Sequence, residues 1–320
     1  MTKKPFLQKI AGLPVAILPT MVGAATLSNM WNSLGFTWIR HLTMWAAAII
    51  FLIYVLKIVL HFNVFKKEYS ATVPASLYGG FCMLLMILGS YVFDYNPVIG
   101  RIMWATGLSI HTIHLLIFIY RNVIKGVKIE TFIPSWFVTF NGIMVSTVVG
   151  TVMNEPTICT IVVYYGIAAL FIVMPFMIAR LIKHPIADPF FQTQAVILAP
   201  SSLCVVGYLN IIQNPIPLVV YVLYTIVFIS LIYVIFMMPK FFTFDFHPGF
   251  AGLTFPMAIG IVASNKMSAF LIAQNQELLG NMLKQVAGLQ LYITTGVIIY
   301  VLFNFYCMLV NSYKSSTESK

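Results

Sequence analysis

The stretch LVVYVLYTIVFISLIYVIFM, residues 218–237, decides the fold class of this chain. It is twenty residues long and has no charged side chain, which is the length that an α-helix needs to cross the hydrocarbon core of a bilayer. Similar stretches recur along the chain. Hydrophobic residues make up 60% of the sequence and charged residues 8%, whereas soluble domains carry about 25% charged residues. The sequence therefore predicts an all-α polytopic membrane protein that forms a single transmembrane domain over residues 1–320. We expect ten transmembrane helices, at about 12–31, 42–61, 74–93, 100–119, 134–153, 159–178, 192–211, 218–237, 249–268 and 290–309.

The distribution of charge explains the net charge of +10 without a nucleic-acid partner. If the N-terminus lies in the cytoplasm, four basic residues face the outside, Arg40, Arg101, Lys266 and Lys284, and the other fourteen lie on the cytoplasmic side. This bias obeys the positive-inside rule and predicts a multi-pass protein of the cell membrane with both termini in the cytoplasm. Lys57 falls within a span near its cytoplasmic end, where we expect its side chain to snorkel.

Five prolines divide the chain into repeats of about sixty residues. Pro14, Pro74, Pro134, Pro189 and Pro248 each stand at the cytoplasmic start of an odd-numbered span. Proline is tolerated in the first turn of a helix, where its missing N–H has no partner to lose. The regular spacing indicates five helical hairpins in series.

The two helices of each hairpin differ in composition. The odd spans hold about twice as many Gly, Ala, Ser and Thr residues as the even spans, and six prolines against one. Small residues let helix backbones approach closely. We therefore expect five inner, odd helices around a central pore and five outer, even helices in contact with lipid. A tightly packed core without a lumen is the alternative. Pro19, Pro200 and Pro256 lie within odd spans and are expected to bend them.

Few residues in the predicted inner helices can carry chemistry. Their polar groups are neutral, whereas proton- or ion-coupled carriers usually place ionisable groups in the membrane. His111 and His114 stand one helical turn apart in an outer span; neutral histidines hydrogen-bonded between helices are favoured over a proton relay or metal pair. Asp188 and His247 each precede one of the entry prolines, and for Asp188 a helix N-cap is favoured over a substrate ligand. The four cysteines are scattered and predict neither disulfides nor a metal site. The sequence contains no catalytic constellation and indicates no cofactor.

Two stretches resemble a known family, LPVAILPTMVGAATLSNMW at 13–31 and FHPGFAGLTFPMAIG at 246–260. Over its ten spans the sequence resembles the tellurite-resistance/dicarboxylate transporter (TDT) family, which includes bacterial TehA-type channels, fungal malate transporters and plant slow anion channels. It departs from the family pattern at Ala16 and Pro19, where glycine is common.

The resemblance implies a homotrimer in the bilayer in which each subunit has its own pore, closed by a phenylalanine on the ninth helix. The matching residue is Phe255, and Phe250 is the alternative if the alignment shifts. The residues expected to line or bend the pore are Pro19, Gly23, Gly142, Pro200, Gly252, Pro256 and Gly260. The predicted function is a channel for small anions. A carrier of C4-dicarboxylates such as malate, with or without protons, and a tellurite-resistance exporter are the alternatives, and a membrane enzyme or scaffold is a third class.

Overall fold

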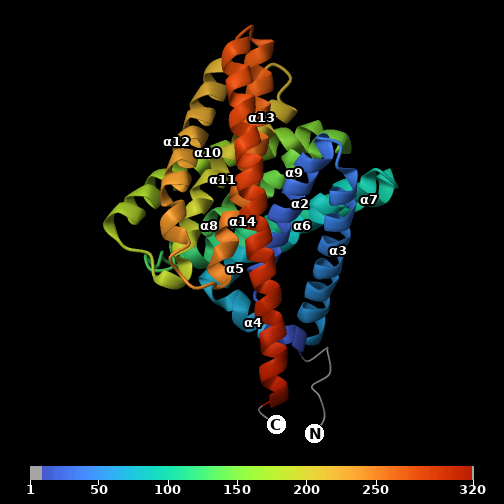
Figure 1. The fold of residues 1–320 in the computed structure, drawn as a ribbon, viewed down its shortest axis with the longest axis vertical. Coiled ribbons are helices and arrows are strands. Elements are labelled where there is room, and N and C mark those ends of the chain that lie inside the picture. Colours follow the sequence, from blue (N-terminus) through green and yellow to red (C-terminus); the bar gives the residue numbers. More distant parts are fainter. Residues whose placement is uncertain (1–8, 319–320) are drawn as a thin grey trace.

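The computed structural model describes residues 9–318 and the side chains as far as Asn311. Every regular element in this range is helical. Five long helices run without a break, and α7 continues into a π-helical turn, η2 (Tyr120–Ile124) (Figure 1). These five are α3 (Thr37–Leu60), α7 (Pro97–Ile119), α10 (Pro156–Lys183), α12 (Pro217–Phe241) and α14 (Glu277–Glu318). The prediction of an all-helical fold is confirmed for the described residues.

The segments between these long helices are interrupted. Each combines α-helix with a turn, a 3-10 stretch or a second short helix, and a surface helix, α4 (Phe62–Ser70), precedes the second of them. In chain order they are η1 (Ile10–Gly12) with α2 (Ile17–Ser33); α5 (Thr72–Leu77) with α6 (Gly79–Phe93); α8 (Trp136–Phe140), η3 (Gly142–Met144), α9 (Val145–Val148) and η4 (Gly150–Met153); η5 (Asp188–Ile197) with α11 (Leu198–Ile211); and η6 (Pro248–Leu253) with α13 (Thr254–Ala273).

Eight helices in the described part of the chain are long and apolar enough to cross a membrane, whereas the sequence predicted ten. The two that fall short are the predicted spans 12–31 and 134–153. The first forms an α-helix of only 17 residues, α2, because residues 13–16 are not helical and separate it from the 3-10 turn η1. The second is divided among α8, η3, α9 and η4.

Side chains from neighbouring helices explain why the segment 136–153 is not one helix. The carbonyl of Thr139 accepts a hydrogen bond from His111 Nε2 at 2.9 Å, and that of Ser146 accepts one from Trp104 Nε1 at 3.0 Å. Asn210 Nδ2 donates to the carbonyls of Thr147 and Val148. Buried backbone groups need partners, and these bonds replace those that a continuous helix would have made.

The three prolines expected to bend inner helices begin their α-helical parts instead. Pro19, Pro200 and Pro256 are each the third residue of an α-helix, in α2, α11 and α13 respectively. The first-turn N–H groups of an α-helix have no intrahelical partner, so proline costs no hydrogen bond there. In α11 and α13 the α-helix directly follows a 3-10 stretch, η5 or η6. Proline therefore marks the change of helix type.

Burial separates the interrupted segments from the long helices. In the apolar 18-residue window of each span, 67%, 83% and 78% of the residues are buried in Thr72–Phe93, Asp188–Ile211 and Pro248–Ala273, respectively. In the five long helices the same share lies between 22% and 44%. In α2 every residue from Ile17 to Ser28 is buried. Each interrupted segment also contacts the next one along the chain, and the last contacts the first: α2 with α6, α6 with α9, α9 with α11, α11 with α13, and α13 with α2. They form a closed ring, which we call the inner ring.

Candidate functional site

Two cavities meet at Phe255. The first, about 370 Å³, is lined by the start of the inner-ring segments, including Pro14, Pro74, Pro189 and Pro248, and is called the inner cavity. The second, about 460 Å³, is lined by the opposite ends of the same segments and is called the outer cavity. Of the residues that the structure describes, Phe255 alone lines both cavities.

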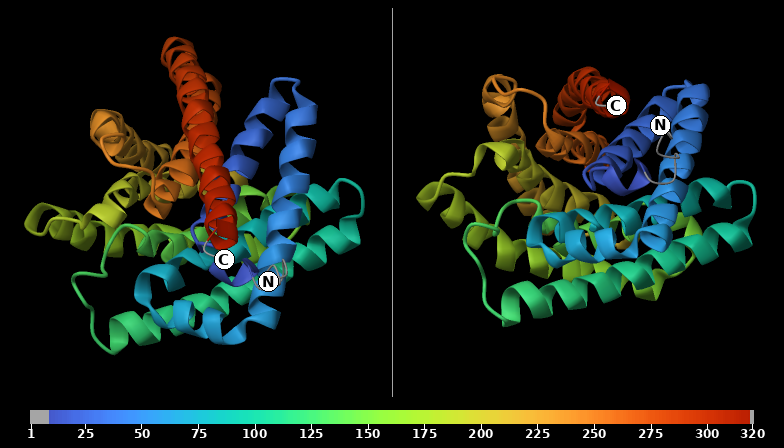
Figure 2. Two further views of the ribbon diagram at one scale, coloured as in Figure 1. Left: turned by 60° about the horizontal axis from the view of Figure 1, so that its bottom comes forward. Right: turned by 90° about the horizontal axis from the view of Figure 1, so that it is seen from below.

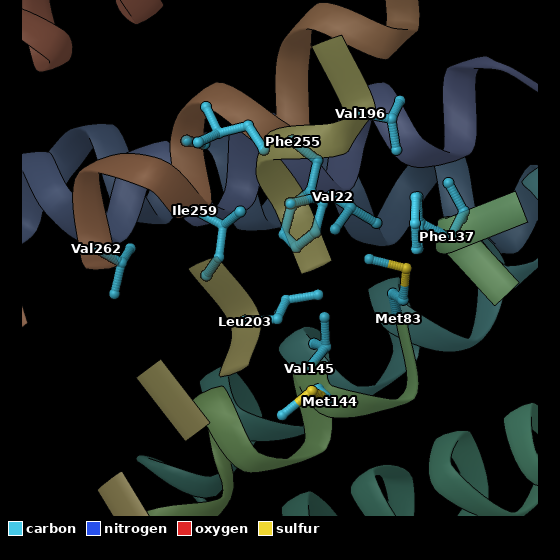
Figure 3. Close-up of a cluster of buried hydrophobic side chains, with 14 of the residues drawn as sticks. Val22, Met83, Phe137, Met144, Val145, Val196, Leu203, Phe255, Ile259 and Val262 are labelled. Atoms are coloured by element: carbon cyan, nitrogen blue, oxygen red, sulfur yellow. The ribbon is translucent and has the colours of Figure 1, made fainter. Parts of the chain in front are cut away.

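The ring of Phe255 lies in the middle of an apolar cluster. Figure 3 shows it beside Val22 of α2 and Ile259 of α13, with Leu203 of α11 close by. Phe255 is 5% exposed. It is the second residue of α13, directly after η6 ends. The change of helix type thus positions the ring between the two cavities.

Phe250 occupies a different environment. Its side chain is fully buried, it lines neither cavity, and its ring packs against Phe242, Phe246 and Tyr300. Phe250 therefore belongs to an aromatic contact between η6 and α14, away from the junction of the cavities.

The other predicted pore residues divide into two groups. Pro19, Gly142, Gly252 and Pro256 line the inner cavity. Gly23, Gly260 and Pro200 line neither cavity and serve packing. A Cβ on Gly23 would lie 2.6 Å from the Phe255 backbone nitrogen, and one on Gly260 would lie 3.2 Å from a Leu198 methyl group. The absence of a side chain at Gly23 thus allows α2 to approach the backbone of α13 at Phe255.

The inner cavity contains a carboxylate that no sequence motif singled out. Glu68 of α4 lines it. One oxygen of Glu68 accepts from Lys57 Nζ at 2.7 Å, and the other accepts from the Tyr78 hydroxyl at 2.6 Å. The chain reverses between α3 and α4 and brings Lys57 and Glu68 together, and no local sequence motif signals that reversal.

The expectation that Lys57 snorkels is wrong. Its side chain is fully buried, and its ammonium group donates to Glu68 and to the Leu13 carbonyl, at 2.7 Å each. A buried ammonium is costly without a charged partner. The partner therefore lies inside the protein, at the rim of the inner cavity.

His247 is the second ionisable group that lines the inner cavity. Its Nδ1 accepts from the Gly249 N–H at 3.1 Å and caps η6. Its Nε2 is buried and has no hydrogen-bond partner among the described residues. Burial lowers the pKa of His247, and the nearby Asp188 opposes that shift. Asp188 lies in the first turn of η5 and makes no capping bond there, in contrast to the expectation.

The outer cavity is more polar. Arg40 Nη2 contacts Asp94 Oδ2 at 2.7 Å, and Arg40 Nε donates to Asn29 Oδ1 at 2.9 Å. Lys266 also lines this cavity, and the ion pairs among the described residues, Arg40–Asp94 and Lys57–Glu68, do not involve it. Two cations and one carboxylate leave this cavity with a positive balance, which favours the entry of anions.

His111 and His114 bridge helices, as the favoured interpretation held. Both bond to Thr139, His111 through the backbone carbonyl and His114 through the hydroxyl at 3.1 Å. The Tyr69 hydroxyl lies 2.6 Å from His114 Nδ1. Among the described residues no group of three His, Cys, Asp or Glu side chains could hold a metal ion, and the four cysteines are free. The histidine pair joins α4 and α7 to the interrupted segment at α8.

Comparison with known families gives a match over almost the whole chain. The family model described as voltage-dependent anion channel, SLAC1, matches residues 12–309. No curated protein matches the sequence. The family match confirms the resemblance that the two quoted stretches indicated.

Proposed function

Because the chain belongs to the voltage-dependent anion channel family, we propose that it conducts small anions through a pore in each subunit and that the Phe255 ring closes this pore. The family is one of channels and not of enzymes. The observation that supports the gate is the position of Phe255, which alone among the described residues lines both cavities. Its rotation to another rotamer would join the two cavities.

The mechanism is steric and dielectric. The lining around the ring is apolar, with Val22, Leu203 and Ile259 beside it (Figure 3). An apolar constriction excludes water and makes the dehydration of an ion prohibitive. The outer cavity, with Lys266 and the paired Arg40, concentrates anions on one side of the barrier. When the ring moves, an anion passes this apolar constriction, which holds no fixed charge that would bind it tightly.

The proposed architecture is the ten-helix one expected from the sequence. The five inner-ring segments, including the two too short or too broken to count as long helices, would surround the pore, and α3, α7, α10, α12 and α14 would face the lipid. The burial contrast and the closed ring of contacts support this arrangement. We further propose a homotrimer in the cell membrane with both termini in the cytoplasm, the latter on the charge bias of the loops.

Replacement of the gate tests the proposal. In planar bilayers, Phe255→Ala is expected to raise anion current several-fold over wild type, because the barrier between the cavities loses its ring. Phe250→Ala is the matched control, since it removes the same ring from the same segment but from a residue that lines neither cavity. An unchanged current in Phe255→Ala, with an increase in Phe250→Ala, would place the gate at Phe250.

The second candidate function is a carrier of C4-dicarboxylates such as malate, and an exporter active in tellurite resistance belongs to the same class. One observation favours it: Glu68 and His247 place ionisable groups in the inner cavity, which proton coupling requires. In proteoliposomes, saturable malate uptake driven by a pH gradient, without anion current in Phe255→Ala, would establish the carrier. Current that rises linearly with anion concentration and ignores the pH gradient would establish the channel.

A further inference from the structure

A groove on the outside of the molecule lies between two outer helices at the end predicted to face the cytoplasm. The cavity has a volume of about 550 Å³ and is lined by η2 and the loop after it on one side and by the last turns of α10 on the other. Figure 2 shows this loop and the end of α10 at the same edge of the molecule. The volume falls within the range of about 300–1,000 Å³ typical of ligand pockets.

The floor of the groove is aromatic and belongs to the inner ring. Trp136 and Phe140 of α8 stack with their ring centroids 6.2 Å apart, and Phe132 packs edge-on against Trp136. The walls carry exposed apolar side chains, including Ile172 and Phe176 of α10. The interior therefore suits a hydrocarbon chain.

One end of the groove is basic. Arg180, Lys183 and His184 line it there. Arg180 is committed to the protein, because its guanidinium donates to the backbone carbonyls of Ile129, His184 and Pro185. Lys183 and His184 are exposed, and the ion pairs among the described residues do not involve Lys183. Glu130 is the only carboxylate on the two segments that form this end, 120–131 and 180–184.

We propose that this groove binds an anionic phospholipid of the cytoplasmic leaflet, with an acyl chain in the apolar trough and the headgroup phosphate at Lys183. Basic pockets between membrane helices on the cytoplasmic side are suited to anionic headgroups. A second copy of the chain is a less suitable occupant, because docking through this same face would bring like charges together. The combination of an apolar trough and a basic end matches the chemistry of one phospholipid molecule.

The site would act on the most interrupted part of the inner ring. Trp136 and Phe140 of α8 face the groove, whereas Phe137 and Val138 of the same helix line the inner cavity. α8 is only five residues long and is followed by a break at Asn141. A bound acyl chain would pack against the outer face of this short helix.

Lipid binding to the purified full chain tests the site without any need for conduction. Native mass spectrometry would measure retention of phosphatidylglycerol and of phosphatidylcholine during titration of each lipid into detergent-solubilised protein. We expect preferential retention of phosphatidylglycerol. Lys183→Gln should weaken it roughly fivefold, the effect of one cation near a headgroup. Lys240→Gln, a cation in the last turn of the outer helix α12 and outside the groove, should leave it unchanged.

A filling variant tests the trough separately. Ala179 lines the groove on α10, so Ala179→Trp should abolish retention, whereas Ala46→Trp on the exposed face of α3 should not. Equal retention of the two lipids, or retention that survives Ala179→Trp, would overturn the proposal. Dissociation of an oligomer in Ala179→Trp with lipid retention unchanged would show that a second copy covers the groove, which also overturns it. Failure of the anion-current test would leave these outcomes unaffected.

Discussion

The inner ring and the outer helices differ in continuity as well as in burial. Each outer helix is a single run of 23 residues or more, and these helices are at most 44% buried. Each inner segment changes its helix type or breaks, although it is surrounded by protein. A helix that faces lipid must satisfy its backbone internally, because the bilayer core offers no partners. A segment surrounded by protein can borrow partners, as the Thr139 carbonyl does from His111.

Both cavities lie in the irregular part of the molecule. The interruptions at Leu253 and Ile197 are where η6 and η5 give way to α-helix, and both flank the cavities. In one continuous α-helix, the side chains that face the cavities would follow a single regular period. The change of helix type after Leu253 places Phe255 at the junction of the two cavities. Regular helices thus lie outside the irregular ones, and the irregular ones shape the two cavities.

Lys57 is a fully buried residue on an outer helix of which little is buried. Its replacement has the largest expected effect on stability. It lies on α3, the least buried of the outer helices, yet it is itself fully buried against Glu68. Lys57→Met would leave a carboxylate without its cation, which costs about 3 kcal/mol, at the lower end for a buried pair because Glu68 is 24% exposed. Thermal unfolding in detergent, followed by circular dichroism, would measure the loss.

The double variant separates charge from packing. Lys57→Met/Glu68→Gln removes both charges and keeps an acceptor for the Tyr78 hydroxyl. We expect it to recover most of the lost stability, because no buried charge then lacks a partner. A double variant as unstable as Lys57→Met would show that the ion pair is not the reason for the loss.

Glycines sharpen the comparison, since the same substitution should have opposite effects inside and outside. Gly23→Ala places a methyl group 2.6 Å from the Phe255 nitrogen and should cost about 1–3 kcal/mol, the usual cost of overpacking. Gly288→Ala on α14, where a Cβ would meet nothing within 4 Å, should be neutral or stabilise by up to about 1 kcal/mol through helix propensity. Melting temperatures of the two variants, compared with wild type, give the answer. Equal effects would mean that α2 and α13 are not in close contact.

The sequence allowed the inner and outer classes to be predicted, but not the interruptions. Small residues and entry prolines marked every inner segment, and Phe255 followed from a motif. The break at 136–153 depends on His111, Trp104 and Asn210, which are far away in the chain. Hydropathy cannot reveal it, since a broken buried segment has the same composition as a continuous one.

The ionisable groups of the inner cavity were missed for a related reason. The predicted inner helices contain almost no ionisable residues, but Glu68 comes from the surface helix α4, and His247 precedes its helix by one residue. Both reach the cavity because the starts of the inner segments converge there. The sequence marked His247 and Asp188 alike as residues before an entry proline, but only His247 lines the inner cavity, and this difference depends on the packing of the inner segments.

His247 gives the smallest expected effect, a pH dependence tied to the start of an inner segment. Burial lowers its pKa in the folded protein below the value of about 6.5 for an unfolded chain. As the pH falls below about 6.5, the unfolded state takes up a proton that the folded state resists, so stability declines until the folded-state pKa is reached. His247→Asn should flatten this decline between pH 7 and 5 in thermal unfolding, while His184→Asn, at the exposed end of the outer helix α10, should keep the wild-type dependence. Because Asp188 opposes the shift, Asp188→Asn should steepen the decline, and an unchanged slope in both His247→Asn and Asp188→Asn would mean that another group carries it.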